Sequence, residues 1–285
     1  MAPTRKKHRK PIRSCVFCDG TRLSKEHIWP NWLRDHVPRD APYNVHTRSF
    51  GKFVDGVGTG LRVDRPRPGD AMSRKLRIVC RTCNNGWMSG LQTICKPFLL
   101  PFVAGRWQDL DNTQQQQLAA WATMFTMVWE FRDLRTLVTP RAQHEQFKRT
   151  SVPPGGWKIW LGQVVDGWEG AANHIAWKIV EVEDGAEDTV EPSVDTQVTA
   201  WCLGSLFLMT FNTINESVHI NESEFAALHG LEVLWPLQDR TISKSARALD
   251  YATANAVVRA ILPPQLEQRF FLDIGELPGT RRPKQ

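Results

Sequence analysis

Three features that the chain lacks narrow the classes of protein to which it can belong. No apolar stretch among its 285 residues is long and uninterrupted enough to span a bilayer; the longest example is Trp201 to Phe211. The first ten residues contain no hydrophobic segment of the kind that directs secretion. Neither an internal repeat nor a long linker is visible. We therefore expect a cytoplasmic globular protein without a membrane partner, whose cysteines stay reduced.

Acidic residues are scarce in the first third of the chain. Residues 1–100 carry 20 Lys+Arg and 7 Asp+Glu, a net charge of +13, whereas residues 101–285 carry 16 and 23, a net charge of −7. Residues 1–13 contain no acid at all, and we expect them to form a disordered basic arm. Such an arm is typical of contacts with phosphate backbones, and also of a terminus that only improves solubility. The residues predicted to bind nucleic acid are Arg5, Lys6, Lys7, Arg9, Lys10, Arg74, Arg77 and Arg81.

Composition and patterning predict an α+β fold. Hydrophobic residues make up 41% of the chain and charged residues 23%, which is typical of a globular protein with a sizeable core. We expect a small zinc-bound module at residues 14–98, followed by a larger domain of helices and antiparallel strands at 99–285. Residues 51–69, rich in glycine and proline, indicate a hairpin or loop insertion in the module.

The expected elements follow from the apolar spacing along the chain. Strands are predicted at residues 74–79, 157–165, 174–183 and 198–211. Helices are predicted to begin at 84–91 and to occupy 118–129, 141–149, 223–229 and 247–260.

Four of the six cysteines form two CxxC pairs. Their members are Cys15, Cys18, Cys80 and Cys83. Two such pairs on tight turns can present four thiolates tetrahedrally, which is the geometry of a structural Zn²⁺. Two disulfides are the alternative, and they would require an oxidising compartment. The remaining cysteines, Cys95 and Cys202, are expected to be buried small hydrophobes.

A Glu-His dipeptide lies between the two cysteine pairs. Histidine has an ordinary pKa of about 6.5, which suits a general base that activates water. Phosphodiester cleavage also requires a cation to take up charge on the phosphate and the leaving oxygen. Because neighbouring residues on a strand point to opposite sides, Glu26 can bind a hard divalent cation while His27 faces the phosphorus. For His27 taken alone, a structural role is the alternative.

The order of these motifs resembles that of the HNH endonucleases of the zinc-stapled His-Me finger (ββα-metal) family. The shared order is CxxC, an acid-His-hydrophobe-x-Pro element, and CxxC-Asn, and it covers residues 15–92. Members of this family fold as a β-hairpin and a helix around one catalytic metal, and they cut DNA. The resemblance implies that His27 is the general base, that Glu26 and Asn84 bind a catalytic Mg²⁺ or Mn²⁺, and that the four cysteines bind zinc.

This chain departs from the family pattern at several positions. Glu26 stands where the family usually has Asp, and Lys75 stands where it has a middle Asn, five residues before the third cysteine. The gap from His27 to Cys80 is 52 residues, longer than is usual in the family. Asn85 is a second candidate for the role of Asn84. We include Lys75 among the catalytic residues, where it would contact the scissile phosphate, although its presence is also consistent with lost activity.

Two functions are predicted from these residues. The first is a metal-dependent endonuclease that hydrolyses DNA, with RNA left open as a substrate. The alternative is a catalytically inactive, zinc-stapled protein that binds nucleic acid on the same frame. Trp29, Trp32 and Trp87 flank the motif and are expected in the core of the small module, with base stacking as the alternative for one of them.

Overall fold

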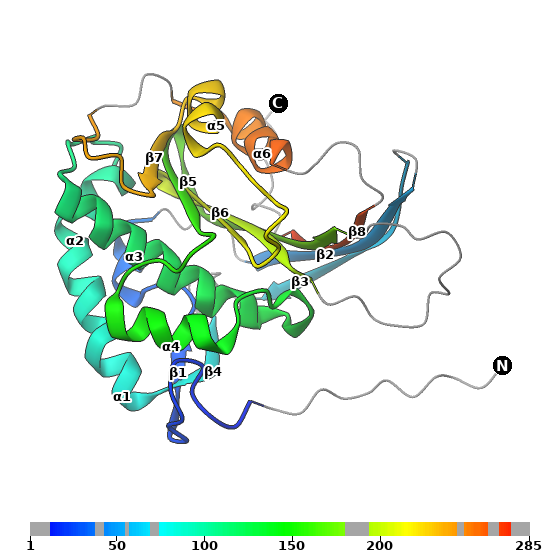
Figure 1. The fold of residues 1–285 in the computed structure, drawn as a ribbon, viewed down its shortest axis with the longest axis horizontal. Coiled ribbons are helices and arrows are strands. Elements are labelled where there is room, and N and C mark those ends of the chain that lie inside the picture. Colours follow the sequence, from blue (N-terminus) through cyan, green and yellow to red (C-terminus); the bar gives the residue numbers. More distant parts are fainter. Residues whose placement is uncertain are drawn as a thin grey trace.

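The computed structural model describes residues 12–37, 43–54, 57–68, 74–179, 194–243, 248–261 and 268–274. Arg5, Lys6, Lys7, Arg9 and Lys10 of the predicted basic arm lie outside the described residues. Helices and antiparallel strands are both present, which confirms the predicted α+β class (Figure 1). Within the described segments, no helix is both long enough and apolar enough to cross a membrane.

The strands form two sheets. Strands β1 (Leu23–His27) and β4 (Lys75–Cys80) pair antiparallel as a two-stranded sheet. The larger sheet has the order β3-β2-β8-β5-β6, and β7 also pairs with β5. Its strands are β2 (Tyr43–Val54), β3 (Val57–Pro68), β5 (Lys158–Ile179), β6 (Thr196–Thr213), β7 (Glu232–Trp235) and β8 (Gln268–Ile274). Every strand pairing in this larger sheet is antiparallel as well.

Helices follow the two-stranded sheet directly. The short helix α1 (Arg81–Cys83) leaves β4, and it continues through a π-helical turn, η3 (Asn84–Met88), into α2 (Ser89–Val103). The strand predicted before the second cysteine pair and the helix predicted after it are both confirmed. The chain thus places two antiparallel strands and a helix in sequence around the cysteine motifs.

The predicted insertion is a hairpin, and it belongs to the larger sheet. Strands β2 and β3 pair along their whole length, from Tyr43 opposite Pro68 to Val54 opposite Val57. Strand β2 also pairs with β8, with Phe50 opposite Phe271. The segment predicted as a separate module therefore contributes strands to the sheet of the following part, and the predicted boundary at residue 98 falls inside α2.

The remaining predicted helices are present, but the helix predicted at 118–129 begins six residues earlier, at Asn112. The α-helices are α3 (Asn112–Trp129), α4 (Arg141–Thr150), α5 (Glu222–His229) and α6 (Tyr251–Ala260). The 3-10 helices are η1 (Asn31–Asp35), η4 (Glu130–Arg132) and η5 (Leu134–Thr136). Asp111 caps α3 because its side chain accepts the Gln114 amide at 2.8 Å, while the Gln114 side chain accepts the Asp111 amide at 3.0 Å. The last helix begins four residues later than the predicted start at 247.

The strands predicted at 157–165 and 174–183 are one strand, so that prediction was wrong. Strand β5 runs from Lys158 to Ile179 and pairs with β6 on both sides of the predicted gap. Gly167 and Gly170 lie in that gap and suggest a turn in the sequence. The register instead shifts between Gln163 and Trp168 and again before Ala171, so bulges absorb the irregular residues without ending the strand.

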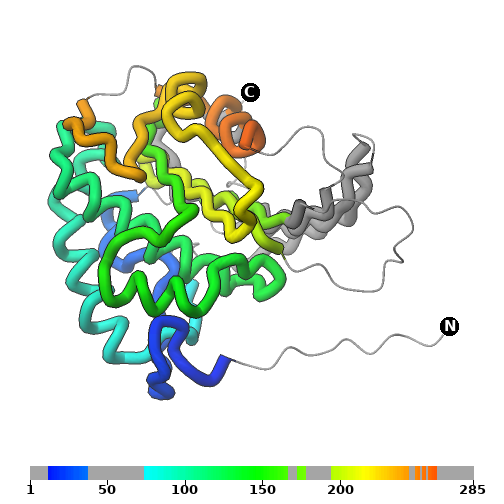
Figure 2. The backbone as a smooth tube through the Cα atoms, viewed as in Figure 1, coloured from blue at the N-terminus to red at the C-terminus, as the bar shows by residue number. Residues whose placement is uncertain are grey.

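Both faces of the larger sheet are covered where β5 pairs with β6. Ile159 and Leu161 lie in a buried cluster with residues of α2 and α3, whereas Trp160, between them, lies in a cluster with residues of α5 and α6. Coverage on both sides explains the nearly continuous apolar sequence of β6, since neither set of alternating side chains meets water. Figure 2 shows residues 12–37 in blue on the same side of the molecule as α2 and α4.

Candidate metal centre and the adjoining strand pair

The four cysteine sulfurs form one cluster. The Sγ atoms of Cys15, Cys18, Cys80 and Cys83 all lie within 4.8 Å of one another. The Cys18 sulfur is 3.6 Å from that of Cys80 and 3.6 Å from that of Cys83. Four sulfurs bound tetrahedrally to zinc at about 2.3 Å would lie about 3.8 Å apart, so these residues fit the ion. All six cysteines fall within the described segments and are free thiols, not disulfides.

Local backbone bonds build each half of the cluster. In the first turn the Cys15 amide donates to the Gly20 carbonyl at 2.8 Å, and the Gly20 amide donates to the Cys18 sulfur at 3.4 Å. In the second turn Cys80 ends β4 and caps α1, where its sulfur accepts the Cys83 amide at 3.4 Å. Gly20 suits this turn because a Cβ atom would lie only 3.0 Å from the Cys80 sulfur, closer than most Cβ contacts.

Cys15, Cys80 and Cys83 have shifted pKa values. Burial raises the pKa of Cys15 and that of Cys83. At Cys80 burial opposes ionisation, but the amide of Cys83 and the neighbouring thiols outweigh it and lower the pKa to about 7. A dication would offset the cost of burying several thiolates, and its affinity should therefore rise with pH.

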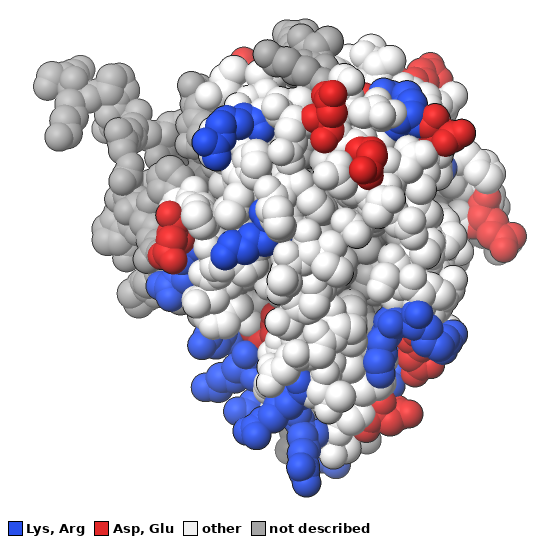
Figure 3. All heavy atoms as spheres, turned by 90° about the vertical axis from the view of Figure 1, so that its left-hand side faces the viewer, with Lys and Arg blue, Asp and Glu red and all other residues white. Residues whose placement is uncertain are grey.

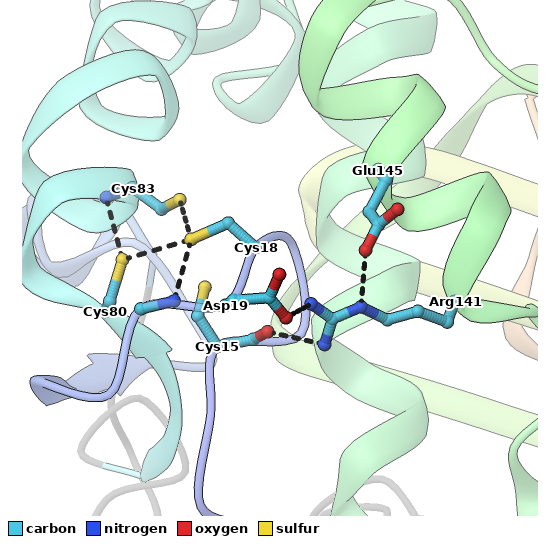
Figure 4. A network of polar contacts seen from close by, with 8 residues as sticks. Cys15, Cys18, Asp19, Cys80, Cys83, Arg141 and Glu145 are labelled. Carbon is cyan, nitrogen blue, oxygen red and sulfur yellow. Dashed lines mark hydrogen bonds and ion pairs between the residues drawn. The ribbon is translucent and has the colours of Figure 1, made fainter.

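An arginine from a distant helix contacts the first cysteine turn (Figure 4). Arg141, at the start of α4, donates through Nη1 to the Cys15 carbonyl at 2.8 Å and through Nη2 to an Asp19 carboxylate oxygen at 2.9 Å. Its Nε donates to Glu145 at 2.8 Å. Sequence analysis missed Arg141, because nothing in the pattern around it points to a partner 126 residues earlier in the chain.

His27 and Lys75 lie opposite each other on the two-stranded sheet. They are Cα partners at one end of the β1–β4 pairing, and Glu26 is the partner of Leu76. Direct partners place their side chains on the same face of a sheet, so His27 and Lys75 share a face and Glu26 points to the other. His27 is half-buried, Lys75 is exposed and Glu26 is only 7% exposed. Burial raises the pKa of Glu26 to about 7.

Asn84 is joined to the strand that carries Glu26 and His27. Its side-chain amide donates to the Ser24 hydroxyl at 3.1 Å, and that hydroxyl donates to the Val79 carbonyl at 3.1 Å. Asn84 is half-buried, whereas its neighbour Asn85 is exposed. Of the two candidate asparagines, Asn84 is the one that donates a hydrogen bond to β1.

Basic side chains surround this strand pair. Arg77 and Arg81 are exposed and Arg74 is half-buried. Arg22 and Lys25 on the neighbouring strand segment are also exposed, and the Arg81 amide donates to the Arg22 carbonyl at 3.1 Å. Figure 3 shows Lys and Arg side chains gathered at the lower end of the molecule, the end at which β1, β4 and α1 lie in Figure 1. Sequence analysis omitted Arg22 and Lys25, although both lie close to the Glu-His dipeptide.

The tryptophans around the motif pack against helices of the following segment. Trp29 is buried, with its ring centroid 4.8 Å from that of Phe125 and 5.5 Å from that of Trp129, both on α3. Trp87 packs edge-on against Phe147 of α4 at 5.8 Å. Trp29 is a core residue as predicted, and Trp87 is half-buried against the same core, which is shared with α3 and α4 instead of being confined to a small module.

The other predicted core positions agree with the structure. Trp32 is half-buried, with its ring nitrogen donating to Gln92 at 3.2 Å and the Lys96 ammonium 5.6 Å from its ring centroid. Cys95 and Cys202 are both buried, as expected.

No family model, curated protein or solved structure matches the chain. The resemblance to HNH endonucleases therefore rests on the residues of the site alone.

Proposed function

We propose that this protein is a metal-dependent endonuclease that hydrolyses the phosphodiester bonds of DNA. The observation that carries the proposal is the pairing of His27 with Lys75 beside a four-cysteine cluster. It places a half-buried imidazole and an exposed ammonium group on one face of a sheet surrounded by basic residues. A phosphate backbone would be attracted to such a face, since it is polyanionic.

Each residue would have a distinct role in hydrolysis. His27 would accept a proton from the attacking water, and Lys75 would contact a phosphate oxygen as a point charge. Glu26 and Asn84 would hold Mg²⁺ or Mn²⁺, because carboxylate and amide oxygens are ligands that hard cations prefer. When bound, that cation would stabilise the charge that develops on the phosphate and the leaving oxygen. The zinc bound by the four cysteines would hold the two turns together and take no part in the reaction.

One observation favours a second function. Glu26 is 7% exposed and points to the face opposite His27 and Lys75, whereas Mg²⁺ usually keeps several water molecules around it and would have to act on the phosphate that His27 faces. A protein that binds nucleic acid through the same basic face without cutting it would leave Glu26 buried and would need Lys75 only as a phosphate contact. In this alternative the zinc cluster and the basic residues keep their roles, and only catalysis is absent.

Nicking of supercoiled plasmid separates the two functions. The parent protein should convert it to open circles with Mg²⁺ or Mn²⁺, and a chelator of these ions should stop the reaction. His27→Ala should lower the rate by about 10²- to 10⁴-fold, because a positioned general base contributes that much. His36→Ala is the matched control, since His36 is an exposed histidine nine residues along. Binding without cleavage by the parent in either metal would establish the second function.

A further inference from the structure

Helix α4 contacts the first cysteine turn in two independent ways. The polar contact is the Arg141 bond to the Cys15 carbonyl, at 2.8 Å. The apolar contact involves Phe17, inside the CxxC sequence, whose ring centroid lies 5.5 Å from that of His144 on α4 and 5.0 Å from that of Trp87. Phe17 is 1% exposed and His144 is 2% exposed, so this contact excludes water. Helix α4 therefore contacts both the backbone of the turn and the buried side chain of Phe17.

The three bonds of Arg141 differ in what they can contribute. The Asp19 side chain is fully exposed, and ion pairs of that kind contribute little. Glu145 lies on α4 itself and orients the guanidinium from the same helix. The bond to the Cys15 carbonyl is the one that joins α4 to the backbone of a metal-binding residue. Four thiolates around Zn²⁺ also carry a net charge of −2, which a nearby guanidinium partly offsets.

We propose that Arg141 is a positioning residue for the zinc site, and that α4 and the first cysteine turn form one cooperative unit. The helix holds the turn in its metal-binding shape, and bound zinc in turn holds the helix against it. This reciprocity follows because two events that stabilise the same arrangement must stabilise each other equally. Arg141 lies outside residues 15–92, and its role requires no nuclease activity.

Zinc affinity of the full-length protein tests the proposal, measured by competition with a chromophoric chelator. Arg141→Ala should weaken zinc binding by about 10- to 100-fold, which is the usual loss when a group that orients a metal ligand is removed. Arg149→Ala is the matched control, because it removes the same charge from an exposed position on the same helix. Asp19→Asn should stay close to the parent protein. If Arg141→Ala binds zinc as tightly as Arg149→Ala, the proposal is wrong.

Two further measurements separate positioning from loss of the fold. If Arg141→Ala does not fold, Arg141→Lys decides instead: it keeps the charge but cannot make the three bonds at once, so its zinc affinity should fall below that of the parent. Cobalt-loaded variants should keep the spectrum of a tetrahedral thiolate site, because the ligands themselves are unchanged. An Arg141→Lys affinity equal to that of the parent, in the absence of a folded Arg141→Ala, would overturn the role of the three bonds.

Hydrogen exchange tests the reciprocal effect. Removing zinc from the parent protein should speed amide exchange in α4 as well as in residues 15–20. Exchange in α5 (Glu222–His229) should stay unchanged, because its buried residue Ala226 belongs to the cluster on the other face of the sheet. Unchanged exchange in α4 after zinc removal would contradict the coupling.

Discussion

Lys75 is the direct cross-strand partner of His27, although 47 residues separate them in the sequence. In the family that this chain resembles, an asparagine occupies the position of Lys75. An amide can orient a histidine, whereas an ammonium group is a cation that contacts anions. The pairing therefore places Lys75, which stands where the family has asparagine, next to the proposed base His27. Both lie on the face that the substrate would approach.

Substitution of Lys75 should show whether it replaces the family asparagine functionally. If Lys75 contacts the scissile phosphate, Lys75→Ala should lower the nicking rate about 10-fold or more. Lys75→Asn should be as slow as Lys75→Ala, because the amide carries no charge. Arg259→Ala is the control, since Arg259 is an exposed basic residue on α6. A Lys75→Asn protein that cuts faster than the parent would show that Lys75 marks weakened catalysis.

Gly20 should be essential to the zinc cluster. In Gly20→Ala the new Cβ atom would lie 3.0 Å from the Cys80 sulfur and 3.4 Å from the Cys18 sulfur, so the Cys80 side chain must give way by a few tenths of an ångström and zinc affinity should fall. Elemental analysis should give about one zinc per chain in the parent and less in this variant. Gly90→Ala is the control, because nothing lies within 4 Å of that Cβ position in α2. It should keep the zinc and stabilise the helix by about 0.5–1 kcal/mol.

His144 should make the protein less stable in mild acid. Burial lowers the pKa of His144 below its ordinary value of 6.5, so the unfolded chain takes up a proton that the folded chain resists. The free energy of unfolding should therefore decrease as the pH falls below 6.5, with a slope of up to about 1.4 kcal/mol per pH unit. His144→Gln should reduce this slope in denaturant unfolding measured from pH 7.5 to pH 5.5.

The comparison of His144→Gln with the parent is needed because zinc release in acid affects both proteins. Zinc release should contribute similarly to the two slopes, so their difference reports on His144. Equal slopes would mean that the imidazole takes up protons as readily in the folded protein as in the unfolded chain, which would contradict the expected effect of burial.

The basic face should bind DNA with a strong salt dependence. Arg77→Ala should reduce the slope of log affinity against log salt concentration by about 1, because one phosphate contact releases about one counterion. The loss should be similar on unrelated DNA sequences, since phosphate contacts carry no sequence information. Arg259→Ala, an exposed arginine on α6, should leave the slope unchanged. Fluorescence anisotropy at several salt concentrations measures the slopes of both variants. Equal slopes for Arg77→Ala and Arg259→Ala would mean that DNA does not bind at the face that carries Arg77.

The spacing of residues along the chain was sufficient to predict the structural features that depend on residues close together in the sequence. The two CxxC turns close through bonds between residues within five positions of each other, so their sequences alone predicted the cluster. The part of α3 from residue 118 to 129 was predicted because it is strongly apolar over three turns. The strand that ends at Cys80 was predicted from its alternation of basic and apolar residues.

The tertiary structure decided which of these elements meet. Arg141 reaches Cys15, β2 pairs with β8, and Trp29 packs on α3, each across a long separation in the sequence. Composition and periodicity indicate which secondary structure a segment prefers, but they do not indicate which distant segment it packs against. The α+β class and the four cysteines of the cluster were therefore determined by the sequence itself. The core shared across residue 98, the unbroken strand β5 and the contact of α4 with the cysteine cluster were decided by packing, because each depends on surfaces that only the folded chain brings together.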